Sequence, residues 1–133
     1  MEESLYSEDV SAEVKWKKDI DENVRSGIVE LLIMKLLTTR DMYGYEIRKM
    51  LYDKTNGAFD MKEASLYGPL YRMQSRGLIS SHKEMAGEKR FRMYYHLEDA
   101  GKEYLEYGLE QIDFVFGGVF ALLNWVDEEE NDK

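Results

Sequence analysis

Three patterns in the sequence predict a mainly α-helical fold with one small β-hairpin, an α+β class. Apolar residues recur at helical spacing in successive segments, alternate with polar residues only between residues 78 and 97, and return to helical spacing from residue 98 onward. The chain of 133 residues is long enough for one hydrophobic core but not for two independent ones. We therefore expect one compact unit with polar ends.

Residues 1–23 form an acidic N-terminal extension. Within it, Val10, Val14 and the stretch Trp16–Ile20 predict one weak amphipathic helix. The extension lacks the apolar segment of a signal peptide. The longest apolar stretch of the chain, residues 28–37, contains two charged residues and is far shorter than the ~20 residues needed to cross a bilayer. We therefore expect a cytoplasmic protein that does not enter the membrane.

Three helices are expected next. The first covers residues 24–38, where apolar side chains occupy most of the helical circumference and indicate burial on several sides. The second covers residues 43–54 and ends at Asn56–Gly57, a pair that favours a left-handed turn. The third covers residues 62–76 and is followed by Gly77, the residue type preferred just after a helix end.

A β-hairpin follows the third helix. Residues 78–85 and 91–97 predict its two strands, and residues 86–90 predict its tip, with Lys89 and Arg90 on one shoulder. In the second strand, alternation predicts one face made of Phe91, Met93, Tyr95 and Leu97. Arg92, Tyr94 and His96 are expected on the opposite face.

Residues 98–126 predict one long C-terminal helix, with Gly117–Gly118 as a potential bend. At ~1.5 Å per residue it would reach about 40 Å and expose too much apolar surface to stand alone. A second copy of the same helix is the natural partner, so we expect a homodimer. The residues expected in this dimer seam are Leu105, Leu109, Ile112, Phe116, Phe120 and Leu123. Residues 127–133 are expected to form an acidic tail.

Charge is unevenly distributed along the chain. Residues 1–24 carry three basic and eight acidic side chains, residues 25–97 thirteen and eight, and residues 98–133 two and eleven. The net charges are therefore −5, +5 and −9, although the whole chain carries −9. The middle segment could approach a phosphate backbone, whereas both ends would be repelled by it. An ordinary solvated surface is the alternative explanation of this pattern.

The order of three helices followed by a hairpin with a basic tip is that of a winged helix-turn-helix. In that fold the third helix enters the major groove of DNA and the hairpin, or wing, contacts the backbone beside it. Tyr67, Tyr71, Arg72 and Arg76 form one stripe along the third helix. Arginine can bind guanine with two hydrogen bonds, and hydroxyl groups can bind phosphate. Each tyrosine taken singly fits a position in the core or at its rim equally well.

Four blocks of residues resemble the PadR family of transcriptional regulators. They are Tyr43–Ile47, Ala64–Tyr67, Leu70–Ile79 and Arg92–Gly101. Each block alone is weak, but four in this order and at these separations are rather specific. The length of the chain is similar to that of the short PadR subfamily, in which one long C-terminal helix forms the dimer.

The resemblance implies a repressor that binds a palindromic operator in double-stranded DNA as a dimer. In some relatives a flat aromatic ligand lies between the subunits, against the first and last helices, and releases the DNA. Carried over by position, the residues that would face DNA are Lys62, Ser65, Tyr67, Tyr71 and Arg72 from the third helix and Lys89, Arg90 and Arg92 from the wing. The spacing of the third helix adds Arg76 to this set.

The chain departs from the family pattern at three places. Pro69 follows Gly68 rather than the Leu–Tyr pair directly, and a proline inside a helix removes one backbone hydrogen bond and can kink it. Lys62 stands where a short polar cap is usual, which leaves the cap to Asp60 or absent. The acidic extension is not a required feature of the family, and it could fold over the basic face or along the last helix.

Two other classes of function are the alternatives to a DNA-binding regulator, namely an enzyme and a protein-binding module. No nucleophile with a base, phosphate-binding loop or metal cluster is present, and the chain has no cysteine and only two histidines, so we expect no enzyme, no catalytic residue, no metal and no cofactor. A winged helix that binds other proteins without DNA is the more serious alternative. The basic middle segment favours DNA, because a protein-binding module would not need it.

Overall fold

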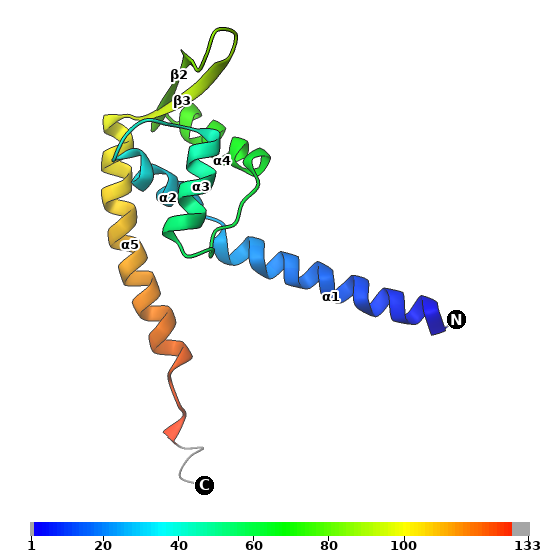
Figure 1. Cartoon of the computed structure of the whole chain (residues 1–133). Helices are drawn as coiled ribbons and strands as arrows, with labels where there is room; N and C mark the ends of the chain where they lie inside the picture. Colours follow the sequence, from blue (N-terminus) through cyan, green and yellow to red (C-terminus); the bar gives the residue numbers. More distant parts are fainter. Residues whose placement is uncertain (1, 129–133) are drawn as a thin grey trace.

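The computed structural model describes residues 2–128, and the side chains of residue 12 and residues 14–128. Helices and strands follow one another in this part of the chain as α1 (Glu2–Arg25), α2 (Val29–Leu37), β1 (Met42–Tyr43), α3 (Gly44–Lys54), α4 (Glu63–Ser75), β2 (Ile79–Met85), β3 (Phe91–Leu97) and α5 (Asp99–Leu123) (Figure 1). The predicted class, mainly helical with a small antiparallel sheet, is confirmed. Of the acidic tail expected at residues 127–133, residues 129–133 lie outside the described part.

Helices α2, α3 and α4 form the centre of the fold, together with the base of the sheet and the first turns of α5. Burying each large aliphatic side chain stabilises the fold by about 1.5–3 kcal/mol. The side chains with essentially no exposure are Ile33, Met34, Met42, Ile47, Leu51, Leu66, Leu70, Met73 and Ile79. All three predicted helices therefore contribute their apolar stripe to one core.

The start of the first core helix differs from the prediction. Residues 24–38 were expected to form one helix, but Val24 and Arg25 end α1, and α2 begins only at Val29. Gly27 separates the two helices, because its φ of +82° is a left-handed conformation that no helix continues. The weak N-terminal helix expected around residues 10–20 is part of α1.

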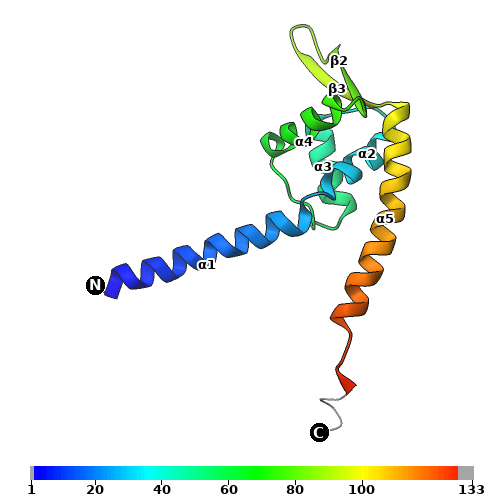
Figure 2. The ribbon, with the colours of Figure 1, turned by 180° about the vertical axis from the view of Figure 1, so that it is seen from behind.

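Helix α1 projects away from the body of the protein, and its base is held by Arg25 (Figures 1 and 2). The Arg25 Nε donates a hydrogen bond to the carbonyl oxygen of Ala58 at 2.7 Å, and its guanidinium lies 5.9 Å from the centre of the Phe59 ring. Helix α1 therefore contacts the loop that joins α3 to α4. Viewed from behind, α1 and α5 leave the body in different directions (Figure 2).

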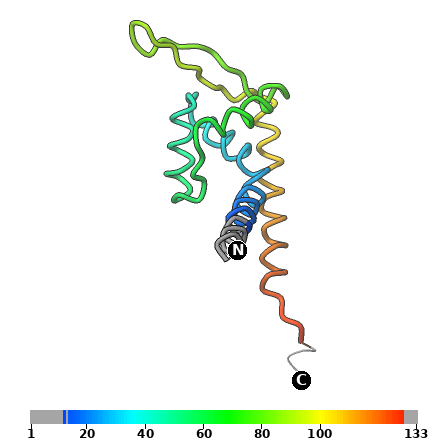
Figure 3. Tube along the Cα trace, turned by 90° about the vertical axis from the view of Figure 1, so that its right-hand side faces the viewer, coloured from blue at the N-terminus to red at the C-terminus, as the bar shows by residue number. Residues whose placement is uncertain are grey.

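The sheet has three antiparallel strands in the order β1-β3-β2, with Met42 paired to Tyr95 and Ile79 paired to Leu97. No strand was expected at β1, whose Tyr43 was assigned to the second helix, because two residues are too few to show any alternation. In β3 only the residues near the body are buried as predicted, whereas Phe91 is 65% exposed and Met93 38%. These two are exposed because the hairpin extends past the core, with its tip on the opposite side of the body from α5 (Figure 3).

Helix α5 is continuous through Gly117 and Gly118, so the potential bend does not interrupt it. Its first turn packs tightly against the sheet, because a Cβ placed on Gly101 would lie 2.2 Å from the carbonyl oxygen of Leu78. Its later turns extend beyond the body (Figure 1). Within residues 2–128 neither α5 nor another helix combines the length and the apolar character that crossing a bilayer requires.

Substitution of Gly101 should therefore destabilise the protein strongly. We expect Gly101→Ala to lower the free energy of unfolding by about 1–3 kcal/mol, because the added methyl group meets backbone atoms that cannot rotate away. Gly117→Ala is the matched control on the same helix, since nothing lies within 4 Å of its Cβ position. The control should gain up to about 1 kcal/mol from helix propensity. Urea unfolding of both variants measures this, and equal stabilities would contradict the packing.

Candidate nucleic-acid interface

Helix α4 has one buried and one exposed face. Its buried residues, Leu66, Pro69, Leu70 and Met73, pack into the core. On the opposite face Tyr67 is 54% exposed and Tyr71 is 74% exposed, which excludes both from the core. The Tyr67 hydroxyl lies 3.5 Å from the Glu63 Oε1, one turn earlier. This face can therefore contact a macromolecule without any change in the packing of the helix.

The two unusual residues of α4 are accommodated without breaking the helix. Pro69 is buried within a helix that continues from Glu63 to Ser75, so the expected loss of one hydrogen bond does not end it. Lys62 occupies the N-cap position and its side chain makes no capping hydrogen bond. A backbone hydrogen bond from the Ser65 N–H to the Lys62 carbonyl oxygen, 2.9 Å long, closes the first turn instead.

Arg72, in the last turn of α4, and Arg76, the C-cap residue directly after it, both pair with Glu30 of α2. The Arg72 Nε donates to the Glu30 Oε1 at 3.0 Å, and the Arg76 Nη1 lies 3.6 Å from the Glu30 Oε2. Both arginine side chains remain 54% exposed, whereas that of Glu30 is only 13% exposed. Glu30 was not expected at this surface, because nothing local in the sequence relates it to Arg72, which lies 42 residues later in the chain.

The wing carries the remaining basic residues of the predicted set. Lys89 and Arg90 are exposed at the hairpin tip, where the Ala86 N–H donates to the Arg90 carbonyl oxygen at 2.8 Å and closes the turn. Arg92 lies at the start of β3 with its guanidinium 4.4 Å from the centre of the Tyr43 ring. Stacking of this kind holds the arginine while leaving its charge exposed.

Tyr43, which contacts Arg92, belongs to a row of three aromatic side chains. The Tyr43 ring lies 5.5 Å from that of Tyr94 in an edge arrangement, and the His82 ring stacks on Tyr94 at 5.9 Å. Tyr43 belongs to β1, so the pairing of β1 with β3 assembles this row. Alternation along β3 predicted Tyr94 opposite the core face, but no sequence pattern predicted Tyr43 beside it, because only the pairing of β1 with β3 brings the two residues together.

All nine residues predicted to face DNA are exposed. The structure distributes them over α4 and the wing, the two elements named in the sequence analysis. The acidic side chains of Glu30 and Glu63 stand among the α4 residues, so this surface is mixed in charge rather than purely basic. Among the described residues, no three His, Cys, Asp or Glu side chains gather in a way that could hold a metal ion.

The residues predicted for a dimer seam fall into three groups. Leu105 is 5% exposed and lies in the core of its own chain, so its side chain is not available to a partner. Ile112 and Phe116 line an apolar groove between α2 and α5. The last group is exposed on the outer part of α5: Leu109 (39%), Phe120 (61%) and Leu123 (73%).

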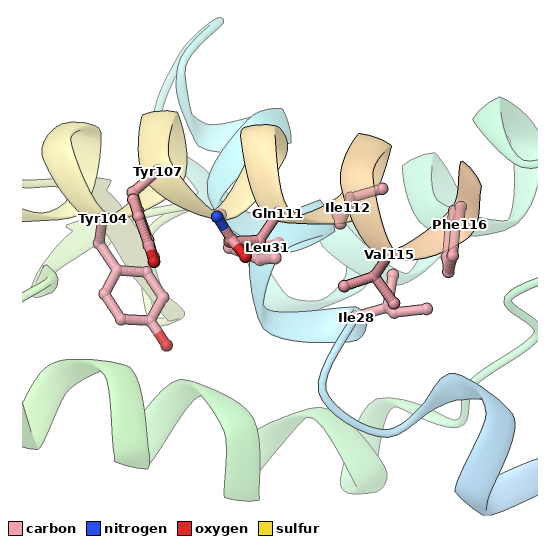
Figure 4. A pocket seen from close by; sticks show the side chains of 9 residues that line it. Ile28, Leu31, Tyr104, Tyr107, Gln111, Ile112, Val115 and Phe116 are labelled. Atoms are coloured by element: carbon pink, nitrogen blue, oxygen red, sulfur yellow. The ribbon is translucent and has the colours of Figure 1, made fainter. Parts of the chain in front are cut away.

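The groove has a volume of about 360 Å³ and lies on the side of α5 that faces α2 (Figure 4). Its walls are almost entirely apolar, and the lining residues with polar side-chain atoms are Gln111, Tyr104 and Tyr107. Leu31 projects into it from α2 (Figure 4). A Cβ on Gly108 would stand 2.4 Å from the Leu31 Cδ2, so the absence of a side chain at residue 108 gives Leu31 its place.

Comparison with family models places residues 33–107 of the chain in the transcriptional regulator PadR-like family. This match covers more than half of the chain and includes α3, α4, the sheet and most of α2.

Three individual proteins illustrate the likeness. A PadR-like transcriptional regulator from Bacillus cereus is 30% identical, with a TM-score of 0.67 over 78% of this chain and 99% of the other. Transcriptional regulator YqjI from Escherichia coli is 28% identical over 89 residues, 67% of this chain but only 41% of YqjI. Bacillus subtilis PadR, solved in complex with operator DNA, shares the fold at 24% identity, with a TM-score of 0.58 over 62% of this chain and 47% of the other.

Unfolding at alkaline pH should depend on Tyr95, a residue of β3 that is only 8% exposed. Burial raises the pKa of Tyr95 above its usual 10.0, and Tyr67 contributes in the same direction. An acid with a raised folded pKa stabilises the fold below its unfolded pKa, and that contribution is lost as the pH rises past it. The free energy of unfolding should therefore fall above pH 10.0, and fall less steeply in Tyr95→Phe.

Urea unfolding at increasing pH measures this difference. Tyr45→Phe is the control, because Tyr45 is 49% exposed, and it should keep the wild-type slope. Identical slopes for Tyr95→Phe and the wild type would contradict a contribution from burial of the phenol.

Proposed function

The chain belongs to the PadR-like family of transcriptional regulators, and from this premise we propose that it is a cytoplasmic dimeric repressor that binds a palindromic operator in double-stranded DNA. The observation that carries the proposal is the exposure of all nine candidate residues on α4 and the wing. Bacillus subtilis PadR, which shares the fold, was solved with operator DNA, and we extend that class of partner to this chain.

In this proposal α4 enters the major groove. Arg72 and Arg76 are the residues that read bases, because a guanidinium can donate two hydrogen bonds to one guanine. Ser65, Tyr67, Tyr71 and Lys62 contact phosphates and fix the register of the helix. Lys89, Arg90 and Arg92 contact the backbone or the minor groove from the wing.

The dimer is formed by α5. Phe120 and Leu123 expose apolar surface on turns that no other element of the described chain covers, and burying it against a second copy removes that surface from water. A two-fold dimer presents two α4 helices related by the same axis, so its preferred DNA site is a palindrome. The acidic side chains of α5 are then kept away from the phosphates.

The groove between α2 and α5 is the proposed effector site. Its volume of about 360 Å³ is at the lower end of the range found for small-molecule sites, and its walls are apolar and aromatic. A planar aromatic compound fits this chemistry, with Gln111 and the two tyrosine hydroxyls available to orient it. Binding there releases the DNA.

A protein-binding winged helix remains the second candidate, and the apolar end of the wing favours it. Met85 is 62% exposed and Phe91 is 65% exposed at the base of the hairpin tip. Neither side chain has a role in binding phosphate. The measurement that separates the two functions is the dependence of DNA affinity on salt.

The wing should contribute to DNA affinity without reading sequence. We expect Lys89→Ala/Arg90→Ala to weaken binding to any duplex, and to reduce the slope of log affinity against log salt by ~0.9 for each phosphate that the variant no longer neutralises. Gel shifts at several salt concentrations measure this, with a duplex selected by the protein from a random-sequence pool. Lys102→Ala on α5 is the control and should change neither quantity. Wild-type affinity that is absent, or indifferent to salt, would favour the protein-binding function.

The outer turns of α5 should hold the dimer together. The wild type is expected at twice the 15.7 kDa mass of one chain, and Phe120→Glu/Leu123→Glu at the mass of one chain, because a charge cannot be buried in an apolar seam without a partner. Light scattering after size exclusion measures both masses. Met85→Glu/Phe91→Glu is the control, as it places the same two charges on exposed apolar residues of the wing. A wild type that remains a monomer at every concentration would contradict the proposal that α5 forms a dimer.

A further inference from the structure

Helix α2 lies between the groove and α4. Two consecutive residues of α2 make these contacts, one with α4 and the other with the groove. Glu30 reaches α4, where it pairs with Arg72 and Arg76. Leu31 reaches the groove and contacts the site of Gly108 on α5. Successive residues of a helix point about 100° apart, so one segment of α2 can serve both sides.

Each carboxylate oxygen of Glu30 pairs with a different arginine. Glu30 accepts the hydrogen bond of Arg72 at Nε, 3.0 Å away, and the ion pair of Arg76 at its other oxygen. The Arg72 Nη1 lies 3.4 Å from the Cβ position of Gly68, so this guanidinium lies back along α4 over a residue that has no side chain. Arg72 is therefore held by Glu30, and the lack of a side chain at Gly68 leaves room for its guanidinium, while the Arg72 side chain stays 54% exposed.

A carboxylate in this position has two effects on DNA binding. It fixes an arginine in the free protein, which reduces the conformational entropy lost when that arginine binds a base. It also places a negative charge beside the phosphates, which weakens binding to every duplex irrespective of its sequence. The first effect increases the ratio of the affinities for the correct and an incorrect duplex, whereas the second lowers both affinities alike and leaves their ratio unchanged.

We propose that Glu30 is a positioning residue that sets sequence discrimination, and that Leu31 couples it to the groove between α2 and α5. The proposal rests on the proposed DNA-binding function. Displacement of Leu31 by an occupant of the groove moves the adjacent Glu30 and releases Arg72 from its fixed orientation. The same α2 segment thus transmits the state of the groove to α4.

The first test compares Glu30→Gln and Glu30→Ala with the wild type on two duplexes, one selected from a random pool and one with the same bases scrambled. We expect affinity for the selected duplex to fall and affinity for the scrambled duplex to rise, so that their ratio falls about tenfold. Alanine should have the larger effect, since glutamine can still accept a hydrogen bond. Glu46→Gln is the matched control, because Glu46 is also a partly buried carboxylate paired with an arginine, Arg40 at 2.9 Å.

An unchanged ratio in both Glu30 variants overturns the proposal. An equal loss of affinity for both duplexes also overturns it, because general destabilisation of the fold produces that result. The ratio of the Glu46→Gln control should stay within about twofold of the wild type.

A measurement without DNA separates this proposal from the proposed function. The Nε–Hε signal of Arg72 in NMR should exchange slowly with water in the wild type and rapidly in Glu30→Ala. If no duplex is bound at any salt concentration, the proposed function fails, and this signal still decides whether Glu30 holds Arg72. Rapid exchange in the wild type overturns the positioning role.

The second test concerns the coupling between the groove and Glu30. A methyl group added at residue 108 takes the place of a ligand in displacing Leu31. Gly108→Ala must displace Leu31, whose Cδ2 is 2.4 Å from the new Cβ, whereas Gly117→Ala meets nothing within 4 Å on the same helix. We expect faster Arg72 Hε exchange and a lower discrimination ratio in Gly108→Ala alone, with both variants keeping the wild-type mass in solution. An unchanged Arg72 signal in Gly108→Ala overturns the coupling.

Discussion

The burial of α2 is the constraint on which the rest of the structure depends. Ile33 and Met34 have no exposed surface, and α2 as a whole contacts α3, α4, β3 and α5. A nine-residue helix has little stability of its own, so its conformation is maintained by this packing. Because every functional element packs on α2, the orientation of α4 relative to α5 follows from how α2 fills the space between them.

The interaction of this protein with a phosphate depends on the charges close to it rather than on the net charge of the chain. The chain is acidic overall, but the tip of the hairpin lies at the opposite end of the molecule from the far ends of α1 and α5 (Figure 1), and its basic side chains are exposed. At physiological salt, screening limits the influence of a charge to about 8 Å, so a distant acidic helix has little effect on a phosphate bound at the wing. The nearby carboxylate of Glu30 matters far more, because it lies within hydrogen-bonding distance of Arg72.

The sequence predicted elements better than it predicted their limits and partners. The helix over 43–54, the helix over 62–76 and both wing strands agree with α3, α4, β2 and β3 within two residues, because each has a clear apolar period and a turn signal at its end. The break at Gly27 was missed because apolar residues continue on both sides of it. Leu105 was assigned to a dimer because its stripe continues into exposed turns, and periodicity cannot tell which turns of a helix its own chain covers.

The sequence by itself determined the class of fold, the order of its elements and the basic residues of α4 and the wing, because these depend on local periodicity and composition. The tertiary structure alone decided which of these residues meet. Glu30 beside Arg72, Tyr43 beside Arg92, and Leu31 beside Gly108 are contacts between residues far apart in the chain. Such contacts arise from the packing of helices and the pairing of strands, and no pattern within a single segment carries that information.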